Sequence, residues 1–296
     1  MKYPLIFLFL LTSWGLSAVS SEPEVISDIP YLGAERSEAM DAYLPGSEFA
    51  RPRPAMLLIH GGGWRVGDKA STRERSIAND LVAEGYAVFS INYKLNVGAR
   101  DPDTKKFSLS VLAWPQNFYD CKSALRFIRK HADEYGVDPA RIGVMGGSAG
   151  GHLAMMVAST AEDAELNQFG LYTEESNAVA CVLNLYGEFD VRGQSVSPFM
   201  GASWEAKKRF SEIASPVTHF TDALPPMLVL HGTADETISV ERSRALVEKL
   251  KTMGAIYEYL EVPDAPHSFD FQPEQMDLRP VVFSFLNKYL KSESVE

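Results

Sequence analysis

The sequence predicts an α/β fold in which a mostly parallel sheet is covered by helices on both faces. Two observations support this prediction. Short apolar runs alternate along the chain with segments of helical periodicity, an order typical of parallel strands joined by helices. The apolar runs are also nearly continuous rather than alternating with polar residues, as expected of strands that are buried on both faces.

Six strands and four helices follow from this pattern, and an N-terminal segment adds two more strands. The expected strands are residues 55–60, 86–93, 141–145, 180–186, 226–231 and 256–262. The expected helices are residues 71–84, 117–135, 239–253 and 280–290, and a glycine follows each of the first three. Glycine is common directly after a helix C-terminus. Residues 24–45 are expected to form two antiparallel edge strands, which makes an eight-stranded sheet.

The composition is that of a folded protein with an acidic surface. The chain has 296 residues, of which 46% are hydrophobic, so it can bury a sizeable core. Its formal net charge of −11 argues against nucleic acid or an anionic membrane as a partner. We expect one domain over residues 24–293. Weak periodicity between residues 188 and 222 predicts a small cap or insertion there.

The first twenty residues have the order of a secretory signal. Lys2 precedes the apolar run 5–11, and small residues follow at positions 18–20. A membrane-spanning helix needs about 20 apolar residues, so this run is too short to cross a bilayer. We therefore expect residues 1–20 to be cleaved and the protein to be exported, to the periplasm or beyond, without a stable membrane anchor.

Two cysteines, Cys121 and Cys181, are present. Export would permit a disulfide between them. Two cysteines do not make a disulfide framework, and neither lies in a turn that is typical of a cysteine nucleophile. We expect both to be buried free thiols.

The motif with the clearest chemistry is Gly-Gly-Ser-Ala-Gly at residues 146–150. It lies between the expected strand 141–145 and the apolar segment 152–158, which has the pattern of a helix. A G-x-S-x-G motif requires this strand–turn–helix context, in which a sharp turn exposes the serine. The sequence therefore predicts Ser148 as a nucleophile at the N-terminal end of a helix, where developing negative charge is stabilised.

A second glycine-rich motif, His-Gly-Gly-Gly-Trp at residues 60–64, follows the first expected parallel strand. Glycines allow bare backbone N–H groups to approach an oxygen that becomes negative during acyl transfer. A motif of this type belongs upstream of the nucleophile. We expect the N–H groups of Gly62, Gly63 and Ala149 to form the oxyanion hole.

These two motifs, together with His-Gly-Thr-Ala-Asp at residues 231–235, resemble the esterase/lipase branch of the α/β-hydrolases. The resemblance extends over residues 30–290. It is greatest to secreted bacterial carboxylesterases, a group that includes acetyl-xylan and feruloyl esterases. It implies an α/β-hydrolase fold and a Ser-Asp-His triad, and it is weak evidence for the substrate.

The acid and the base follow from the chain order of this fold, in which the serine precedes the acid and the acid precedes the histidine. Asp235 lies in a loop after an expected strand. Its rivals fit less well: Asp222 precedes that strand, Glu236 is offset from the motif, and Asp264 is close to the base. His267 follows Asp235 and is predicted as the base. The other five histidines, expected to be exposed or structural, are His60, His131, His152, His219 and His231.

The sequence thus predicts a serine carboxylesterase that acts on short acyl or aryl esters. Acetyl or feruloyl groups on plant polysaccharide are the suggested targets, and no metal or organic cofactor is expected. Two alternatives stay open: an amidase or formamidase similar to kynurenine formamidase, and a binding protein that has kept the scaffold without the chemistry. Trp64, Trp114 and Phe199 are candidates to line the substrate pocket. The sequence makes no prediction of oligomeric state.

Overall fold

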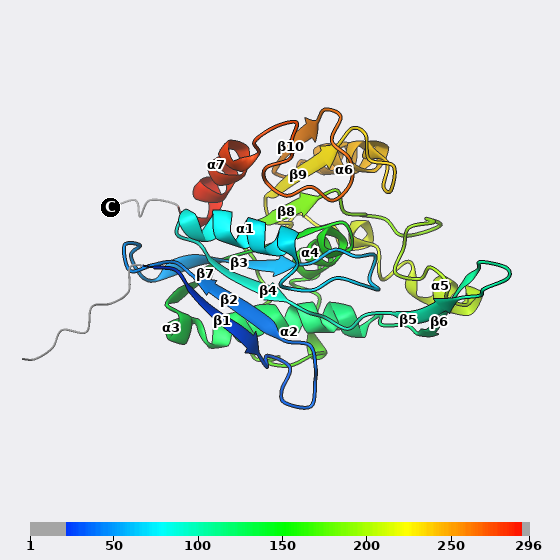
Figure 1. Ribbon diagram of the computed structural model, residues 1–296, viewed down its shortest axis with the longest axis horizontal. Coiled ribbons are helices and arrows are strands. Elements are labelled where there is room, and N and C mark those ends of the chain that lie inside the picture. Colours follow the sequence, from blue (N-terminus) through cyan, green and yellow to red (C-terminus); the bar gives the residue numbers. More distant parts are fainter. Residues whose placement is uncertain (1–21, 292–296) are drawn as a thin grey trace, which may run out of the picture.

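The computed structural model describes residues 22–291, whose centre is an eight-stranded sheet (Figure 1). Its strands are β1 (Glu24–Ile29), β2 (Met40–Leu44), β3 (Arg53–Ile59), β4 (Ala87–Ile91), β7 (Val137–Gly147), β8 (Val182–Leu185), β9 (Met227–Gly232) and β10 (Tyr257–Val262). They lie in the order β1-β2-β4-β3-β7-β8-β9-β10. Strand β2 is antiparallel to both β1 and β4, and the remaining neighbours are parallel. The predicted fold class is confirmed.

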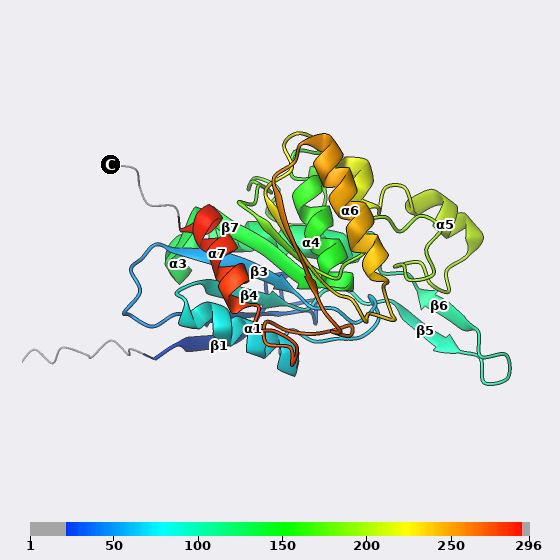
Figure 2. The ribbon, with the colours of Figure 1, turned by 90° about the horizontal axis from the view of Figure 1, so that it is seen from above.

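Helices cover the sheet on both faces (Figure 2). One layer consists of α1 (Thr72–Ala83) and α7 (Arg279–Leu290), and the other of α2 (Gln116–Lys130), α4 (Ala149–Ser159) and α6 (Val240–Met253). Strand β3 shows how one strand serves both layers. Met56 and Leu58 belong to the core beneath α1 and α7, whereas Leu57 and Ile59 belong to the core beneath α2, α4 and α6. Successive side chains of a strand point to opposite faces, so a continuous apolar run fills two cores.

Two expected boundaries differ from the observed ones. The helix expected at residues 117–135 is divided into α2 and the short α3 (Ala132–Tyr135), because His131 between them leaves helical geometry with ψ 20°. The helix expected from residue 152 begins at Ala149, directly after the serine. Glycines at positions 150 and 151 hid its first turn, since glycine has a low helix propensity.

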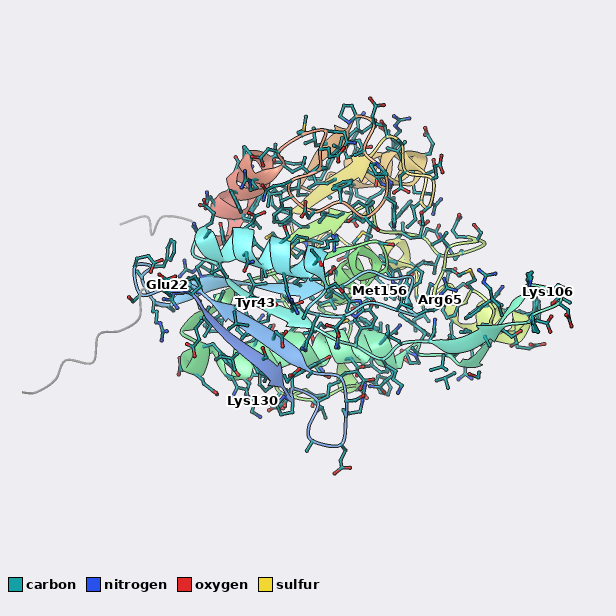
Figure 3. The ribbon with its side chains drawn as sticks, viewed as in Figure 1. Glu22, Tyr43, Arg65, Lys106, Lys130 and Met156 are labelled. Carbon is teal, nitrogen blue, oxygen red and sulfur yellow. The ribbon has the colours of Figure 1, made fainter. Side chains whose placement is uncertain are left out.

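The sequence analysis missed a projecting hairpin and the helix beside it. The hairpin consists of β5 (Val97–Arg100) and β6 (Phe107–Val111), and Lys106 marks its outer part (Figure 3). Helix α5 (Trp204–Phe210) lies next to it in both ribbon views, within the segment 188–222 where a cap was expected. Two 3-10 turns, Leu166–Gln168 and Pro216–His219, complete the elements. The hairpin is mostly exposed, so it lacks the apolar pattern by which the other strands were found.

Three further expectations concern export, membrane spans and the two cysteines. The expected signal at residues 1–20 lies outside the described residues, so export stays a prediction. Within residues 22–291, no helix is both long and apolar enough to cross a membrane. Cys121 and Cys181 are buried and free, as expected. Burial raises the pKa of the Cys181 thiol to about 12, which makes it a poor nucleophile at neutral pH.

A buried lysine in α2 should make stability depend on pH. Lys122 donates to the carbonyl oxygen of Thr160 and to the side chain of Asn167, and burial lowers its pKa to about 7. In the unfolded chain the pKa of a lysine is about 10.4, so unfolding lets Lys122 bind its proton more tightly. This difference lowers the free energy of unfolding by its full amount below pH 7, and the loss disappears as the pH rises towards 10.

We expect Lys122→Met to raise the melting temperature relative to the wild type, by on the order of 5 °C more at pH 6 than at pH 9.5. Scanning calorimetry of both proteins at the two pH values measures this difference. A difference in melting temperature that does not change with pH would show that Lys122 is not the titrating group.

Candidate active site

Ser148 occupies the turn between β7 and α4. Its backbone has φ 56° and ψ −119°, a conformation that residues with a side chain rarely adopt. The flanking glycines explain how the turn is possible. A Cβ atom at Gly146 would overlap the backbone of Gly150, and one at Gly150 would overlap the carbonyl oxygen of Ile59 in β3. The turn therefore requires glycine at both positions, and it holds the Ser148 hydroxyl at the carboxyl end of the central strand.

The structure brings Ser148, His267 and Asp235 together in one hydrogen-bonded chain. The Ser148 hydroxyl lies 2.9 Å from Nε2 of His267, and Nδ1 of His267 lies 2.6 Å from Oδ2 of Asp235. Asp235 comes from the loop after β9 and His267 from the loop after β10. These loops leave neighbouring parallel strands at the same edge of the sheet, which is where sites of open α/β sheets are built.

The Asp235 carboxylate is held by several further contacts. Its Oδ1 accepts hydrogen bonds of 2.8 Å from the N–H groups of Thr237 and Ile238, and the imidazole of His231 lies against Oδ2. Burial alone would raise the pKa of Asp235, but hydrogen bonds from His231, His267 and Ile238 hold it well below its usual range. The carboxylate therefore stays ionised and orients the His267 ring.

The rival acids lie elsewhere. Asp222 is exposed and precedes β9, Glu236 is exposed, and the exposed Asp264 donates its N–H to the Thr233 hydroxyl. Four of the other five histidines have backbone partners: His60 with Gly61, His152 with Ala214, His219 with Ile213 and His231 with Ile238. His131 pairs with Glu134 on the surface.

The glycine-rich loop lies directly beside Ser148. Gly62 has φ +102°, and its carbonyl oxygen accepts the N–H groups of Arg65 and Val66 in a tight turn. Gly61, Gly62 and Ser148 line a common cavity of about 150 Å³. Gly63 follows in the same loop with φ +60°, outside the lining of that cavity, and Ala149 is the first residue of α4. The role of Gly62, Gly63 and Ala149 as oxyanion donors stays a prediction.

Residues 40–250, which contain the serine turn, the glycine-rich loop and Asp235, match the model of the BD-FAE family. The chain belongs to the BD-FAE family. It is 30% identical to Esterase LipC of Mycobacterium tuberculosis (strain ATCC 25618 / H37Rv) over 250 residues, which are 80% of this chain and 58% of that protein. It is also 30% identical to Esterase LipQ of the same strain over 256 residues, 82% of this chain and 57% of that protein. The chain thus spans just over half the length of these curated relatives.

Solved structures of two esterases have the same fold as this BD-FAE chain. The first, described as a truncated form of carbohydrate esterase from gut microbiota, has a TM-score of 0.76 at 21% identity and covers 92% of this chain and 98% of its own. The second, esterase 2 of Thermogutta terrifontis with butyrate bound, has a TM-score of 0.70 at 24% identity and covers 92% and 97%. The predicted α/β-hydrolase fold and the resemblance to its esterase branch are confirmed.

The glycine-rich loop of this BD-FAE member is held by side chains that the sequence analysis did not connect with it. The Tyr93 hydroxyl donates to the carbonyl oxygen of His60 over 2.9 Å, and the two rings stack at 4.4 Å. Nε1 of Trp64 donates to Nδ1 of His152 over 3.3 Å, and Nε2 of His152 donates to the carbonyl oxygen of Ala214 over 2.7 Å. Burial lowers the pKa of His152 to about 4, so the ring is neutral and can accept from Trp64.

The proposed pocket aromatics are part of the core instead. Trp64, Trp114 and Phe199 are 1%, 4% and 1% exposed, and they pack around the His152 ring and one another. None of the three lines the cavity at Ser148. The expectation that they form the substrate pocket is not supported, because aromatic side chains near loop ends more often fill gaps between elements than face a ligand.

Hydrogen bonds from Arg73 in α1 and from Tyr186 hold the loop after β10, which carries His267. Tyr186, which follows β8, has φ 44° and donates its hydroxyl to the carbonyl oxygen of Phe269 over 2.5 Å. Nε of Arg73 in α1 donates to both that hydroxyl (2.9 Å) and that carbonyl oxygen (3.0 Å). The Tyr186 ring lies 4.8 Å from the His267 ring. Three distant segments therefore fix the loop that carries His267.

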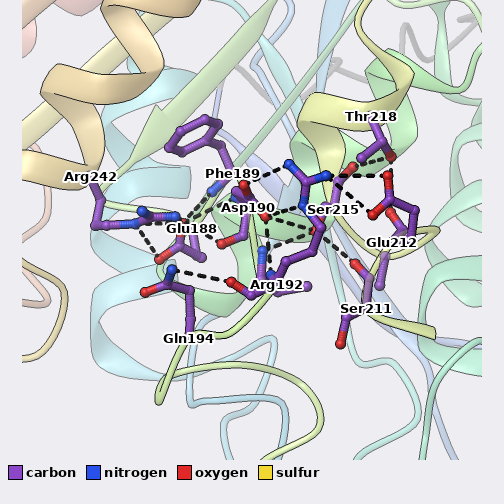
Figure 4. A network of polar contacts seen from close by, with 12 residues as sticks. Glu188, Phe189, Asp190, Arg192, Gln194, Ser211, Glu212, Ser215, Thr218 and Arg242 are labelled. Carbon is purple, nitrogen blue, oxygen red and sulfur yellow. Dashed lines mark hydrogen bonds and ion pairs between the residues drawn. The ribbon is translucent and has the colours of Figure 1, made fainter. Parts of the chain in front are cut away.

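Charged side chains connect the hairpin and the segment after β8 to neighbouring elements. The guanidinium of Arg65, which directly follows the glycine-rich loop, lies 4.9 Å above the ring of Phe107 in β6. Figure 4 shows a network in which Arg242 of α6 binds Glu188 through Nε and Nη2, at 2.6 to 3.0 Å. It continues through Asp190 to Ser215 and to Arg192, which pairs with Glu212. Within the described residues, no group of three or more His, Cys, Asp or Glu side chains could hold a metal ion.

Substitution of Gly62 with Ala should lower kcat by about 10²–10³-fold, the typical cost of one lost oxyanion donor. A Cβ atom at this position would overlap the carbonyl group of Val66, so the loop has to shift. Gly33→Ala is the matched control, since Gly33 also has a positive φ (+85°), lies outside the glycine-rich loop, and a Cβ atom there would meet nothing within 4 Å. Steady-state kinetics with 4-nitrophenyl acetate compare the two variants. Equal losses would show that crowding against Val66 is not the cause.

Proposed function

We propose that the protein is a serine carboxylesterase that hydrolyses esters of short acyl groups, with Ser148, His267 and Asp235 as its triad. The observation that carries this proposal is the hydrogen-bonded chain from the Ser148 hydroxyl through His267 to Asp235, at 2.9 Å and 2.6 Å. A nucleophile, a base and an orienting acid within hydrogen-bond reach are what acyl transfer requires. Membership of the BD-FAE family and the similarity to proteins named esterases support it.

The mechanism follows from the positions of the protons along the hydrogen bonds that join Ser148, His267 and Asp235. Asp235 accepts Nδ1–H of His267, so Nε2 is free to accept the Ser148 proton as the serine attacks the ester carbonyl. The N–H groups of Gly62, Gly63 and Ala149 stabilise the negative oxygen that forms. Nε2 then gives its proton to the leaving alcohol. Water repeats the sequence on the acyl-enzyme and releases the acid.

We infer that acetyl groups, including those on plant polysaccharide, are the substrates. The cavity beside Ser148 is small, at about 150 Å³, which suits an acetyl group better than a feruloyl group. Similar folds occur in proteins described as a carbohydrate esterase from gut microbiota and a bifunctional GH43-CE of Bacteroides eggerthii. These similarities support a carbohydrate-linked ester as the target.

A panel of esters tests the proposal. We expect kcat/KM to fall at least about tenfold from 4-nitrophenyl acetate to the octanoate, because a longer chain exceeds the cavity. Acetylated xylan should release acetate, and a feruloyl ester should react more slowly than the acetyl ester. Activity on a formamide above that on the acetyl ester would favour an amidase. Absence of hydrolysis together with absence of fluorophosphonate labelling at Ser148 would favour a binding protein.

A further inference from the structure

His231 places a second imidazole against the carboxylate of Asp235. Its Nε2 lies 3.1 Å from Oδ2 of Asp235, and both side chains are completely buried. The same Nε2 lies 2.8 Å from the carbonyl oxygen of Ile238, and Nδ1 lies 2.6 Å from the Ser243 hydroxyl of α6. Oδ2 of Asp235 therefore faces two rings, His231 on one side and His267 at 2.6 Å on the other.

The partners of His231 fix the position of its proton. Carbonyl and carboxylate oxygens only accept hydrogen bonds, so Nε2 carries a hydrogen. It donates this hydrogen to Ile238, and Oδ2 of Asp235 lies 3.1 Å from the same nitrogen. With the single ring hydrogen on Nε2, Nδ1 accepts a hydrogen bond from the Ser243 hydroxyl at 2.6 Å. The positive end of the Nε2–H dipole therefore lies close to Oδ2 of Asp235, the oxygen that contacts His267.

We propose that His231 is a positioning residue that tunes how strongly His267 holds its proton, acting through Asp235. This proposal rests on the proposed esterase function. The His231 N–H stabilises negative charge on Oδ2 and opposes positive charge on the nearby His267 ring. Without this donor, Oδ2 interacts more strongly with His267, which then keeps its proton to higher pH and is less available as a base near neutrality.

Other charged and titratable groups around the two rings stay unchanged when only His231 is altered. Glu261 of β10 lies beside His231 in the sheet register, and Arg244 of α6 donates to Glu261 over 2.8 Å. The ring of Tyr186 lies 4.8 Å from the His267 ring and 6.3 Å from the His231 ring, and Arg73 is bonded to its hydroxyl. A change in the pH profile of a His231 variant therefore reports the lost donor.

Two amide substitutions that differ in reach test the proposal. In His231→Asn the amide occupies the position of Nδ1, where it can contact Ser243 but not Asp235. In His231→Gln the amide reaches the position of Nε2 and can donate to Oδ2. We expect the acidic limb of the pH profile of kcat/KM to move up by about half a pH unit or more in His231→Asn, the size of one modest hydrogen bond. His231→Gln should stay within about 0.2 unit of the wild type.

Ser243→Ala is the matched control, since it removes the other partner of His231 and leaves the contact with Asp235. Its acidic limb should not move. An NMR titration of the His267 ring provides a second measurement that does not need turnover. If His231→Asn does not fold, His231→Met replaces it, because methionine fills the space without a donor. An unchanged acidic limb and an unchanged His267 titration in the donor-free variant would overturn the proposal. A wild-type protein that hydrolyses no ester would instead contradict the proposed function.

Discussion

Ser148→Ala should lower kcat/KM for 4-nitrophenyl acetate by at least about 10⁴-fold while the protein stays folded. The substitution removes one atom, the hydroxyl oxygen whose hydrogen-bond partner is Nε2 of His267. The remaining residue keeps a Cβ atom and can occupy the same turn between β7 and α4. What is lost is therefore the nucleophile, and the oxyanion donors account for any residual rate.

Steady-state kinetics and circular dichroism of the purified variant measure both parts of this expectation. Ser159→Ala is a suitable control, because Ser159 ends the same helix, α4, away from the turn. It should keep nearly all activity. A fluorophosphonate probe should label the wild type and Ser159→Ala but not Ser148→Ala. Retention of more than about 1% of the activity by Ser148→Ala would mean that another group performs the attack.

Asp235→Asn should lower kcat by about 10⁴-fold at neutral pH. The reason lies in the three hydrogen bonds of the carboxylate and in its contact with His231. Oδ1 accepts two backbone N–H groups, so the oxygen of an asparagine must take that side and its NH₂ group must face the two imidazoles. His267 then has to present an unprotonated Nδ1 and keep its hydrogen on Nε2. A ring in that state cannot accept the proton of Ser148.

The comparison requires variants that remove one negative charge without touching the triad. Asp264→Asn and Glu236→Gln serve this purpose, since both residues are exposed and lie within four residues of His267 or Asp235. Both should retain activity within about twofold of the wild type, the range of a modest surface effect. Kinetics at pH 7 compare the three variants. A loss in either control as large as that in Asp235→Asn would point to a general effect of charge.

The sequence was informative where one physical rule limited the choice. Glycine was required on both sides of Ser148, the parallel strands were continuous apolar runs, and the chain order left His267 as the histidine after the acid. The structure agrees with each of these observations: Gly146 and Gly150 have no room for a Cβ atom, and His267 lies 2.6 Å from Asp235.

The sequence was uninformative where a role depends on a partner far along the chain. His152 and His231 belong to the same buried class as many core residues, and nothing local shows that one joins Trp64 to Ala214 or that the other contacts the triad acid. The hairpin was missed because exposed strands carry no burial pattern. Trp64, Trp114 and Phe199 were assigned to a pocket because aromatic side chains suit both a ligand and a core.

The hydrogen bonds of Asn96 determine which part of the projecting hairpin can change in length. Its side chain accepts the N–H of Ala113 over 2.7 Å and donates to the carbonyl oxygen of Pro198 over 2.8 Å, while its own N–H donates to the carbonyl oxygen of Trp64 over 2.8 Å. Asn96 and Ala113, which flank the hairpin segment, are thus hydrogen-bonded to each other. We therefore expect the outer turn of the hairpin, between β5 and β6, to tolerate changes in length while the contacts of Asn96 with Trp64, Ala113 and Pro198 stay in place.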